Sequence, residues 1–380
     1  EDSDLVIDLS ASDPEDDDLE YFVFGENGES LSSLGNTVAG SHRHSLSLNT
    51  DGTVSAWGSN VDGNTTVEGL SDVVSVHAAN RRSLALHSDG AVTSWGYSDG
   101  PDVPEGLSDV IAVDMNEMHT IVLHSDGTAT AWGTYEYAPT SNSVPEGLSD
   151  IVAISAGRDS NIVLHSDGTL TFWGYNAWGV GDIPEGIEGN VKSLSSGRTH
   201  TIALLLDGTI VGWGANHDNQ VTIPSGLSDV ISISSGNSHN LALKSDGTVV
   251  AWGNNQYGQS TVPENLSNVV GISTGLYHSL AVQSDGMVVA WGKNDFNQSS
   301  VPEGIVAAVP GNETMDVSIN NSELLITPDA NFNGNIELIV LVSDGQLEDS
   351  ELVTISVLPV NDAPVMSEIE DSQVSEDTTF

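Results

Sequence analysis

Residues 238–275 read SHNLALKSDGTVVAWGNNQYGQSTVPENLSNVVGISTG, and this stretch decides the fold. It joins a His-led apolar run, an Asp-Gly turn and a second run that ends in Trp-Gly. The same wording occurs in seven copies spaced 37 to 41 residues apart, with the turn at Asp51, Asp89, Asp126, Asp167, Asp207, Asp246 and Asp285. Short strands around a tight turn at this period are typical of one propeller blade. The sequence therefore predicts an all-β fold with a seven-bladed β-propeller over residues 27–305.

The composition excludes several classes of partner. With 55 acidic and 8 basic residues the chain has a net charge of -47, which argues against nucleic acid because binding to phosphate needs many Lys and Arg contacts. No apolar run approaches the roughly 18 residues that a membrane helix requires, so we predict no membrane insertion of this segment. Cysteine is absent, which excludes a disulfide framework and a thiol nucleophile.

The segments on either side of the repeats carry a different pattern. Alternating apolar residues predict strands near residues 5–9 and 19–23 before the ring, and three more at 315–327, 336–342 and 352–358 after it. Neither flank is long enough to bury a core alone, but together they have the size of a small β-sandwich. We predict one Ig-like sandwich from residues 1–26 and 306–361, interrupted by the propeller, and the truncated start of a further repeat over 362–380.

The flanks also resemble a known family. The strings EDSDLVIDLSASDPEDDDLEYFV at 1–23, ITPDANFNGNIELIVLVSDG at 326–345 and VLPVNDAPV at 357–365 are similar to the tandem cadherin-like, Ig-like repeats of long bacterial surface proteins and adhesins. This resemblance implies an extracellular or bacterial cell-surface location, and a monomeric segment of a longer multidomain chain.

The ring repeats resemble the family named for the regulator of chromosome condensation. The strings AWGNNQYG and GQSTVPEN are closest in wording to the secreted bacterial type, typified by the propeller-shaped β-lactamase inhibitory protein. That type implies binding of a protein target by aromatic loop residues of one face. The family's nucleotide exchange on a small GTPase is implied by the family name alone, and a strongly acidic, extracellular chain argues against it.

Most recurring residues of the repeat are expected to pack rather than to react. The Trp of each Trp-Gly pair is expected between blades. A histidine seven residues before the turn recurs in five blades, and we expect these buried imidazoles to hydrogen-bond backbone: His44, His119, His200, His239 and His278. Three further histidines precede successive turns by two residues, at His87, His124 and His165, and we expect them to lie too far apart to share one metal ion.

The rare basic residues point to one face of the ring. In an antiparallel blade, the loop before the His-led strand and the loop after Trp-Gly lie at the same end. We predict a ligand-binding face made of Arg43, Arg81, Tyr97, Tyr135, Tyr137, Arg158, Tyr175, Trp178, Arg198, Tyr257, Tyr277 and Phe296. Arg and aromatic side chains commonly anchor protein interfaces and stack on sugars. In the alternative interpretation, the aromatics cap blade edges and the Arg residues share a face by chance.

Calcium is the one cofactor that the sequence suggests. Asp13, Glu15 and Asp17 alternate in an acidic loop, and Asp344 and Asp362 stand at matching turns of the resembled cadherin-like repeat. Carboxylates at such spacing suit a hard, oxygen-ligated cation. A solvated acidic loop is the alternative for each of these residues.

Taken together, the sequence predicts a non-enzymatic binding or adhesion module whose propeller presents an Arg/aromatic face to a protein or glycan at the cell surface. No nucleophile, base and orienting group stand in a recognisable set, so no catalytic residue is predicted. Two alternatives from other classes are a purely structural spacer and a polysaccharide hydrolase or lyase.

Overall fold

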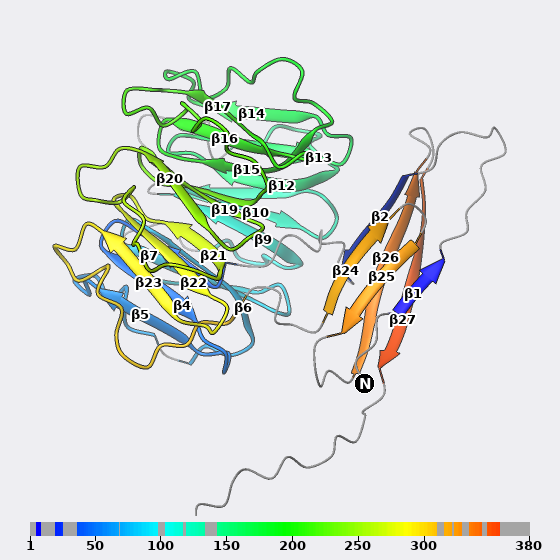
Figure 1. Cartoon of the computed structure of the whole chain (residues 1–380), viewed down its shortest axis with the longest axis horizontal. Helices are drawn as coiled ribbons and strands as arrows, with labels where there is room; N and C mark the ends of the chain where they lie inside the picture. The colour runs from blue at the N-terminus through cyan, green and yellow to red at the C-terminus, as the bar shows by residue number, and fades with distance from the viewer. Residues whose placement is uncertain are drawn as a thin grey trace, which may run out of the picture. The chain divides into compact units, whose positions relative to one another are not determined.

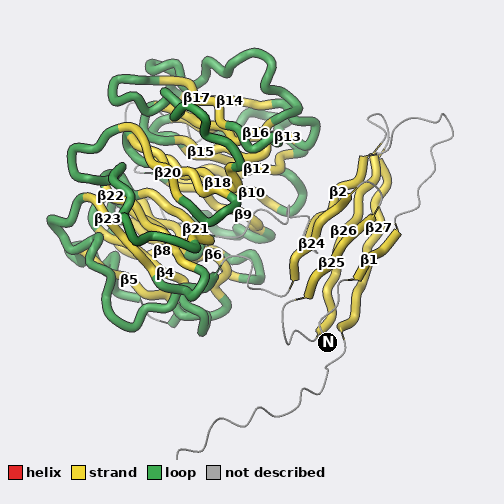
Figure 2. Tube along the Cα trace, in the orientation of Figure 1, coloured by secondary structure: helices red, strands yellow, loops and turns green. Residues whose placement is uncertain are grey.

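The computed structural model describes residues 36–67, 69–97, 103–116, 119–133 and 143–309, together with six strands outside this region. The chain forms two compact units, one from Glu1–Val23 with Thr314–Phe380 and one from Phe24–Glu313. Figures 1 and 2 show that the described part consists of strands and loops. No helix in it is long and apolar enough to cross a membrane.

The second unit contains seven three-stranded antiparallel sheets in chain order, which confirms the predicted all-β fold with seven blades (Figure 1). Blades 1 to 4 are β3 (Val38–Gly40), β4 (His44–Leu48) and β5 (Val54–Gly58); β6 (Val73–Ala79), β7 (Arg82–His87) and β8 (Val92–Gly96); β9 (Val110–Met115), β10 (His119–His124) and β11 (Ala129–Gly133); β12 (Ile151–Ala156), β13 (Ser160–His165) and β14 (Leu170–Gly174). Blades 5 to 7 are β15 (Val191–Ser196), β16 (His200–Leu205) and β17 (Ile210–Gly214); β18 (Val230–Ser235), β19 (His239–Lys244) and β20 (Val249–Gly253); β21 (Val269–Thr274), β22 (His278–Gln283) and β23 (Val288–Gly292).

Each Asp-Gly turn is closed by its own side chains. In blade 6 a carboxylate oxygen of Asp246 accepts hydrogen bonds from the Thr248 backbone N–H at 3.0 Å and from its hydroxyl at 2.6 Å. These bonds, the hydroxyl first, lower the pKa of the exposed Asp246 carboxyl. Gly247 has φ +75°, a conformation that glycine adopts without strain. The turn carboxylates therefore have a local structural role.

The tryptophans fill the space between neighbouring blades. Trp252 of β20 is 7% exposed and packs in one cluster with Ile202 and Leu204 of blade 5 and with Val230 of its own blade. Its Nε1–H donates to the backbone carbonyl of Gln220 at 2.9 Å. The indoles of Trp57, Trp213 and Trp291 donate to backbone carbonyls in the same way, so these side chains are apolar on their faces and hydrogen-bonded at their edge.

The recurring histidines connect blades through side chains, so the predicted hydrogen bonds to backbone are wrong. Each imidazole donates from Nε2 to the residue that follows the His position in the next blade. The pairs are His44 with Ser83 at 2.9 Å, His119 with Asn161 at 2.7 Å, His200 with Asn240 at 2.7 Å, His239 with Ser279 at 3.1 Å, and His278 with Ser45 at 2.8 Å. The imidazoles bond to side chains because the backbone N–H and C=O groups of these strands are already paired within the sheets.

Two blades depart from this pattern together. Arg82 and Ser160 occupy the His position in blades 2 and 4, and the next blades carry Thr120 and Thr201 where the other pairs have Ser or Asn. The donor position and its partner position thus differ in the same two places. The histidine and its partner in the next blade therefore occur together or are replaced together, although the two residues lie about 40 positions apart in the sequence.

The ring closes through blade 7, blade 1 and a short segment after β23. Trp57 of β5 donates to the Gln298 carbonyl at 2.9 Å. Val306 and Ala307, which the sequence prediction assigned to the flank, instead bridge to Met287 and Asn49, and Ala308 donates its N–H to the Leu48 carbonyl at 2.7 Å. Backbone pairing with both end blades keeps this segment with the ring.

The first unit has two three-stranded sheets, ordered β1-β25-β24 and β2-β26-β27. Their strands are β1 (Leu5–Asp8), β2 (Glu20–Gly25), β24 (Met315–Asn320), β25 (Glu323–Pro328), β26 (Gly334–Ser343) and β27 (Glu348–Val357). The single strand predicted over 315–327 is wrong: it is a hairpin in which β24 pairs with β25. In each sheet a strand that precedes the ring pairs with one that follows it. An Ig-like or cadherin-like identity of this unit stays a prediction.

Candidate functional site

The predicted site residues lie in two sets of loops at one end of the blades. Backbone hydrogen bonds tie the loop after each Trp-Gly pair to the loop before the middle strand of the same blade. In blade 2 the Tyr97 N–H donates to the Arg81 carbonyl at 3.1 Å, and in blade 7 the Lys293 N–H donates to Tyr277 at 2.9 Å. We call this end the Arg/aromatic face. The Asp-Gly turns occupy the other end, which we call the turn face.

The densest part of the Arg/aromatic face lies at the junction of blades 7 and 1. The Lys293 ammonium lies over the rings of Tyr257 and Tyr277, 4.7 Å and 5.2 Å from their centroids. The two rings meet edge to face at 5.5 Å, and His42 packs against Tyr277 at 5.6 Å. Cation–π contacts hold the ammonium in place, and it also pairs with a carboxylate oxygen of the exposed Asp295 at 3.4 Å.

Two arginines are held in the same manner. The Arg43 guanidinium lies 4.7 Å from the Phe296 ring centroid, across the junction of blades 1 and 7. Arg81 lies 5.5 Å from the ring of Tyr97, which is 39% exposed, and its Nε is 3.5 Å from a carboxylate oxygen of Asp62. Two of the predicted Arg residues, Arg43 and Arg81, are therefore each paired with a predicted aromatic residue.

The cations of this face share one electrostatic environment. Burial lowers the pKa of His42, and the positive charges of Arg43, Lys293, Arg81 and Arg198, in that order, lower it further. Four cations thus act on one imidazole within a chain whose net charge is -47. A local basic region of this kind attracts acidic groups of a partner.

Arg158 and Arg198 lie where the Arg/aromatic face meets the central channel. Both belong to the loops that follow the first strands of blades 4 and 5, and both line the channel. Arg158 Nε is 3.7 Å from a carboxylate oxygen of Asp159. The pKa of Asp159 is raised above its ordinary value, because burial outweighs the charges of Arg158 and Arg198, which act to lower it. These three groups form a charged cluster with an excess of one positive charge.

The remaining predicted aromatics are spread more widely. Trp178 is 48% exposed and meets His217 edge to face at 5.9 Å, and Tyr175 is 52% exposed. Tyr135 and Tyr137 lie outside the described residues. The predicted calcium residues, Asp13, Glu15, Asp17, Asp344 and Asp362, also lie outside them, so calcium stays a prediction. Within the described part, no group of three or more His, Asp or Glu side chains is placed to hold a metal ion.

Each of the three histidines of the turn face, His87, His124 and His165, is hydrogen-bonded within its own blade. His124 Nδ1 donates to the Ser108 carbonyl at 2.9 Å, and its Nε2 accepts from the Thr130 hydroxyl at 2.8 Å. His87 and His165 make the same two contacts in blades 2 and 4. Because both ring nitrogens are used, these side chains fasten the loops of their own blades.

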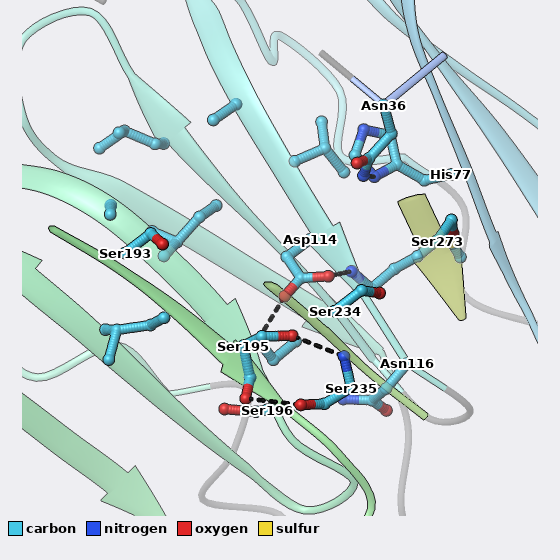
Figure 3. A pocket seen from close by; sticks show the side chains of 18 of the residues that line it. Asn36, His77, Asp114, Asn116, Ser193, Ser195, Ser196, Ser234, Ser235 and Ser273 are labelled. Atoms are coloured by element: carbon cyan, nitrogen blue, oxygen red, sulfur yellow. Dashed lines mark hydrogen bonds between the residues drawn. The ribbon is translucent and has the colours of Figure 1, made fainter. Parts of the chain in front are cut away.

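A central channel of about 650 Å³ runs along the ring axis, bounded by the first strands of the seven blades. Its wall carries hydroxyls from several blades, including Ser193 and Ser195 of β15 and Ser232 and Ser234 of β18. Figure 3 shows this pocket with Asp114 of β9 close to Ser195 and Ser234, and with Asn36 next to His77. The lining thus combines hydroxyls with aliphatic side chains, among them Ile231 and Ile233.

Asp114 takes a position that serine takes in the following blades. One carboxylate oxygen accepts the Ala156 N–H of the next blade at 2.8 Å, as the Ser155 hydroxyl accepts the Ser196 N–H at 2.8 Å and Ser195 accepts the Ser235 N–H at 2.9 Å. Burial raises the pKa of Asp114 to about 6, against the hydrogen bonds that favour its charged form. A carboxylate is therefore built into a hydroxyl-lined wall.

Sequence reasoning missed Lys293, His42 and the whole channel. Lys293 follows Trp-Gly directly, at the same loop position as Tyr97 and Tyr175, so the rule that selected those tyrosines would have found it. The channel had a signal in the strings SLSS and SISS, since strands that place serine at alternate positions present a polar side. The inward direction of that side depends on ring closure, which the local pattern does not contain.

Comparisons with known proteins agree with this architecture. The family model of the regulator of chromosome condensation (RCC1) repeat matches residues 191–220, 230–259 and 269–298, which cover the strands of blades 5 to 7. The entire ectodomain of the receptor kinase CR4 from Physcomitrella patens is similar, with 19% identity, a TM-score of 0.58 and coverage of 80% of this chain and 90% of that one.

The CRINKLY WD40 ectodomain of the receptor kinase ACR4 from Arabidopsis thaliana is also similar, with 19% identity, a TM-score of 0.56 and coverage of 72% of this chain and 97% of that one. No curated protein matches the chain. At such identities the two solved structures support the fold and nothing further.

Proposed function

We propose that this chain, whose ring is an RCC1-like β-propeller, is a non-enzymatic binding module that holds an acidic protein partner against its Arg/aromatic face. The observation that carries the proposal is the cluster of Lys293, Tyr257 and Tyr277 with His42. Its cation is pre-positioned by two rings, so little side-chain freedom is lost on binding. Exposed aromatic and Arg side chains are the residues that most often dominate binding energy at protein interfaces.

The location belongs to the same proposal. The resemblance of the flanks to cadherin-like repeats of bacterial surface proteins supports an extracellular or cell-surface adhesion role. Intact cells of the source organism treated with a protease that cannot enter them should lose the propeller from their surface. Full protection of the chain until the cells are lysed would contradict this location.

A charge-reversal experiment tests the face. We expect the variant Arg81→Glu, Arg158→Glu, Arg198→Glu to bind its partner at least about tenfold more weakly, because cations that faced acidic groups become repulsive. Partners are captured on residues 1–380 from bacterial cell-surface protein extracts and assayed by surface plasmon resonance, with a glycan array beside them. The matched control is Asp72→Asn, Asp109→Asn, Asp229→Asn on the turn face, where Asn tolerates the positive φ; it should stay within about twofold.

Cross-linking gives an independent reading of the same face. The lysines of the chain are Lys192, Lys244 and Lys293. The two lysines lie at opposite ends of the blades: Lys293 is on the Arg/aromatic face, 3.4 Å from an Asp295 carboxylate oxygen, and Lys244 is on the turn face, 3.5 Å from Asp246. An amine-reactive cross-linker should therefore join the captured protein through Lys293. Capture that is unaffected by charge reversal, or cross-links confined to Lys192 and Lys244, would overturn the site. Capture of glycans alone would replace the protein partner by a sugar ligand.

A further inference from the structure

We propose that the central channel binds a sugar acid, with its carboxylate at Arg158 and Arg198 and its hydroxyl groups against the serine wall of blades 5 and 6. The site goes beyond the proposed docking face, because its serine wall and Asp114 lie inside the ring; Arg158 and Arg198 belong to both. Its volume of about 650 Å³ is in the range of small-molecule sites, which run from about 300 to 1,000 Å³.

The serine wall has unused hydrogen-bonding capacity. Ser193 and Ser195 alternate on β15, as Ser232 and Ser234 do on β18, and residues two apart on a strand face the same side. Ser195 and Ser234 have partners in the next blade. Within the part of the chain that the structure describes, the half-buried hydroxyls of Ser193 and Ser232 have no side-chain hydrogen-bond partner. Hydroxyls that both donate and accept suit a polyhydroxy ligand.

The two ends of the channel differ in charge, which sets the direction of the ligand. Arg158 and Arg198 line one end, with Asp159 beside them. Asp126 and Asp150 line the turn-face end together with Lys192. An anion is therefore attracted at the arginine end and repelled by the acidic side chains at the other.

Asp114 also favours a ligand whose carboxylate points toward the arginines and whose hydroxyls point into the channel. It precedes Asn116, a residue of the channel lining next to the Arg/aromatic face, by two positions, so its carboxylate lies deeper than the two arginines. A carboxylate at this depth disfavours a second negative charge and accepts hydrogen bonds from ligand hydroxyls. A ligand that is anionic at one end and hydroxylated along its body satisfies both conditions.

Three probes and three variants test this site in the full chain by isothermal titration calorimetry at neutral pH. We expect d-glucuronate to bind, and d-glucose, which lacks the carboxylate, and acetate, which lacks the hydroxyls, to bind at least about tenfold more weakly. Arg198→Gln should weaken glucuronate binding about tenfold. The double variant Ser193→Val, Ser232→Val should weaken it at least about fivefold, and the control Arg81→Gln, outside the channel, should stay within about twofold.

Absence of glucuronate binding at millimolar concentration, equal binding of glucose, or unchanged binding by both Arg198→Gln and the serine double variant would overturn the proposal. If the double variant does not fold, the comparison of probes and Arg198→Gln still decide. A uronic-acid disaccharide distinguishes a free sugar acid from the end of a glycan, and tight binding of either supports the site. Since the serine variant leaves the Arg/aromatic face intact, it should still capture the protein partner, so the two proposals can fail separately.

Discussion

Acidification from about pH 7 to about pH 5 is expected to unfold the propeller. Burial lowers the pKa of His44, His239 and His278 to about 3 and that of His77 and His200 to about 4, all from an ordinary value of 6.5. These imidazoles are neutral in the native ring, where each donates one proton across a blade junction or to a neighbouring hydroxyl.

The direction of the effect follows from proton uptake. Below pH 6.5 the unfolded chain protonates these histidines and the folded ring does not, so the free energy of unfolding falls as pH falls. The loss is about 1.4 kcal/mol per pH unit for each histidine, hence about 7 kcal/mol per unit for all five until the folded pKa is approached. The raised pKa of Asp114 acts in the opposite direction and offsets about one of them. Near pH 5 the loss reaches the whole stability of an ordinary domain, about 5 to 15 kcal/mol.

Intrinsic fluorescence gives a clean measurement, because all eight tryptophans fall between Trp57 and Trp291 and report on the ring alone. Urea unfolding at several pH values between about 7 and 5 should give a steeply falling stability, and His239→Gln should reduce the slope by about 1.4 kcal/mol per unit. Stability that is constant over this window, or a slope that His239→Gln leaves unchanged, would contradict buried neutral histidines.

The second large effect concerns the indoles between blades. Trp252→Ala is expected to lower the free energy of unfolding by about 3 to 5 kcal/mol, because it leaves a cavity between blades 5 and 6 that the strands cannot fill. The Gln220 carbonyl keeps a hydrogen bond from Asn240 at 2.8 Å, so the loss arises from packing. Urea unfolding followed by far-ultraviolet circular dichroism measures it.

Trp178→Ala is the matched control, since the same side chain is removed from the Arg/aromatic face, where the ring is 48% exposed. We expect a loss of less than about 1 kcal/mol in stability, together with weaker capture of the protein partner. Similar destabilisation by both variants would show that the loop indole also packs as core. Retention of stability by Trp252→Ala would refute the inter-blade role.

The fold was predictable because the repeat carries it locally. Asp-Gly turns, apolar strand runs and Trp-Gly ends recur often enough that the pattern identifies blades without an alignment. Ring closure was less predictable, since Val306 and Ala307 have no repeat wording and belong to the propeller only through backbone pairing. The hairpin of β24 and β25 was missed because the polar stretch NNSE at 320–323, which separates their two apolar runs, was taken as part of one strand.

The candidate site was likewise predictable where it depends on local sequence and not where it depends on closure of the ring. Which loops share a face follows from strand order, so Arg43 and Phe296 could be placed on one face from sequence. That they form a cation–π pair across the junction of blades 1 and 7 could not, because the two residues lie far apart in the chain and meet only in the closed ring. The partner of each buried histidine was hidden for the same reason: Ser279 is meaningful for His239 only once blades 6 and 7 are neighbours.

The first and last segments of the ring both hydrogen-bond to the backbone of Leu48. Leu48 donates its N–H to the Thr37 carbonyl at 2.8 Å, and its own carbonyl accepts the N–H of Ala308 at 2.7 Å. A folded body whose two chain ends lie so close together can be gained or lost by a gene as one uninterrupted cassette, at the place of a single surface loop, without stretching the protein that receives it. The propeller can therefore pass from one protein to another as a single piece, together with its Arg/aromatic face.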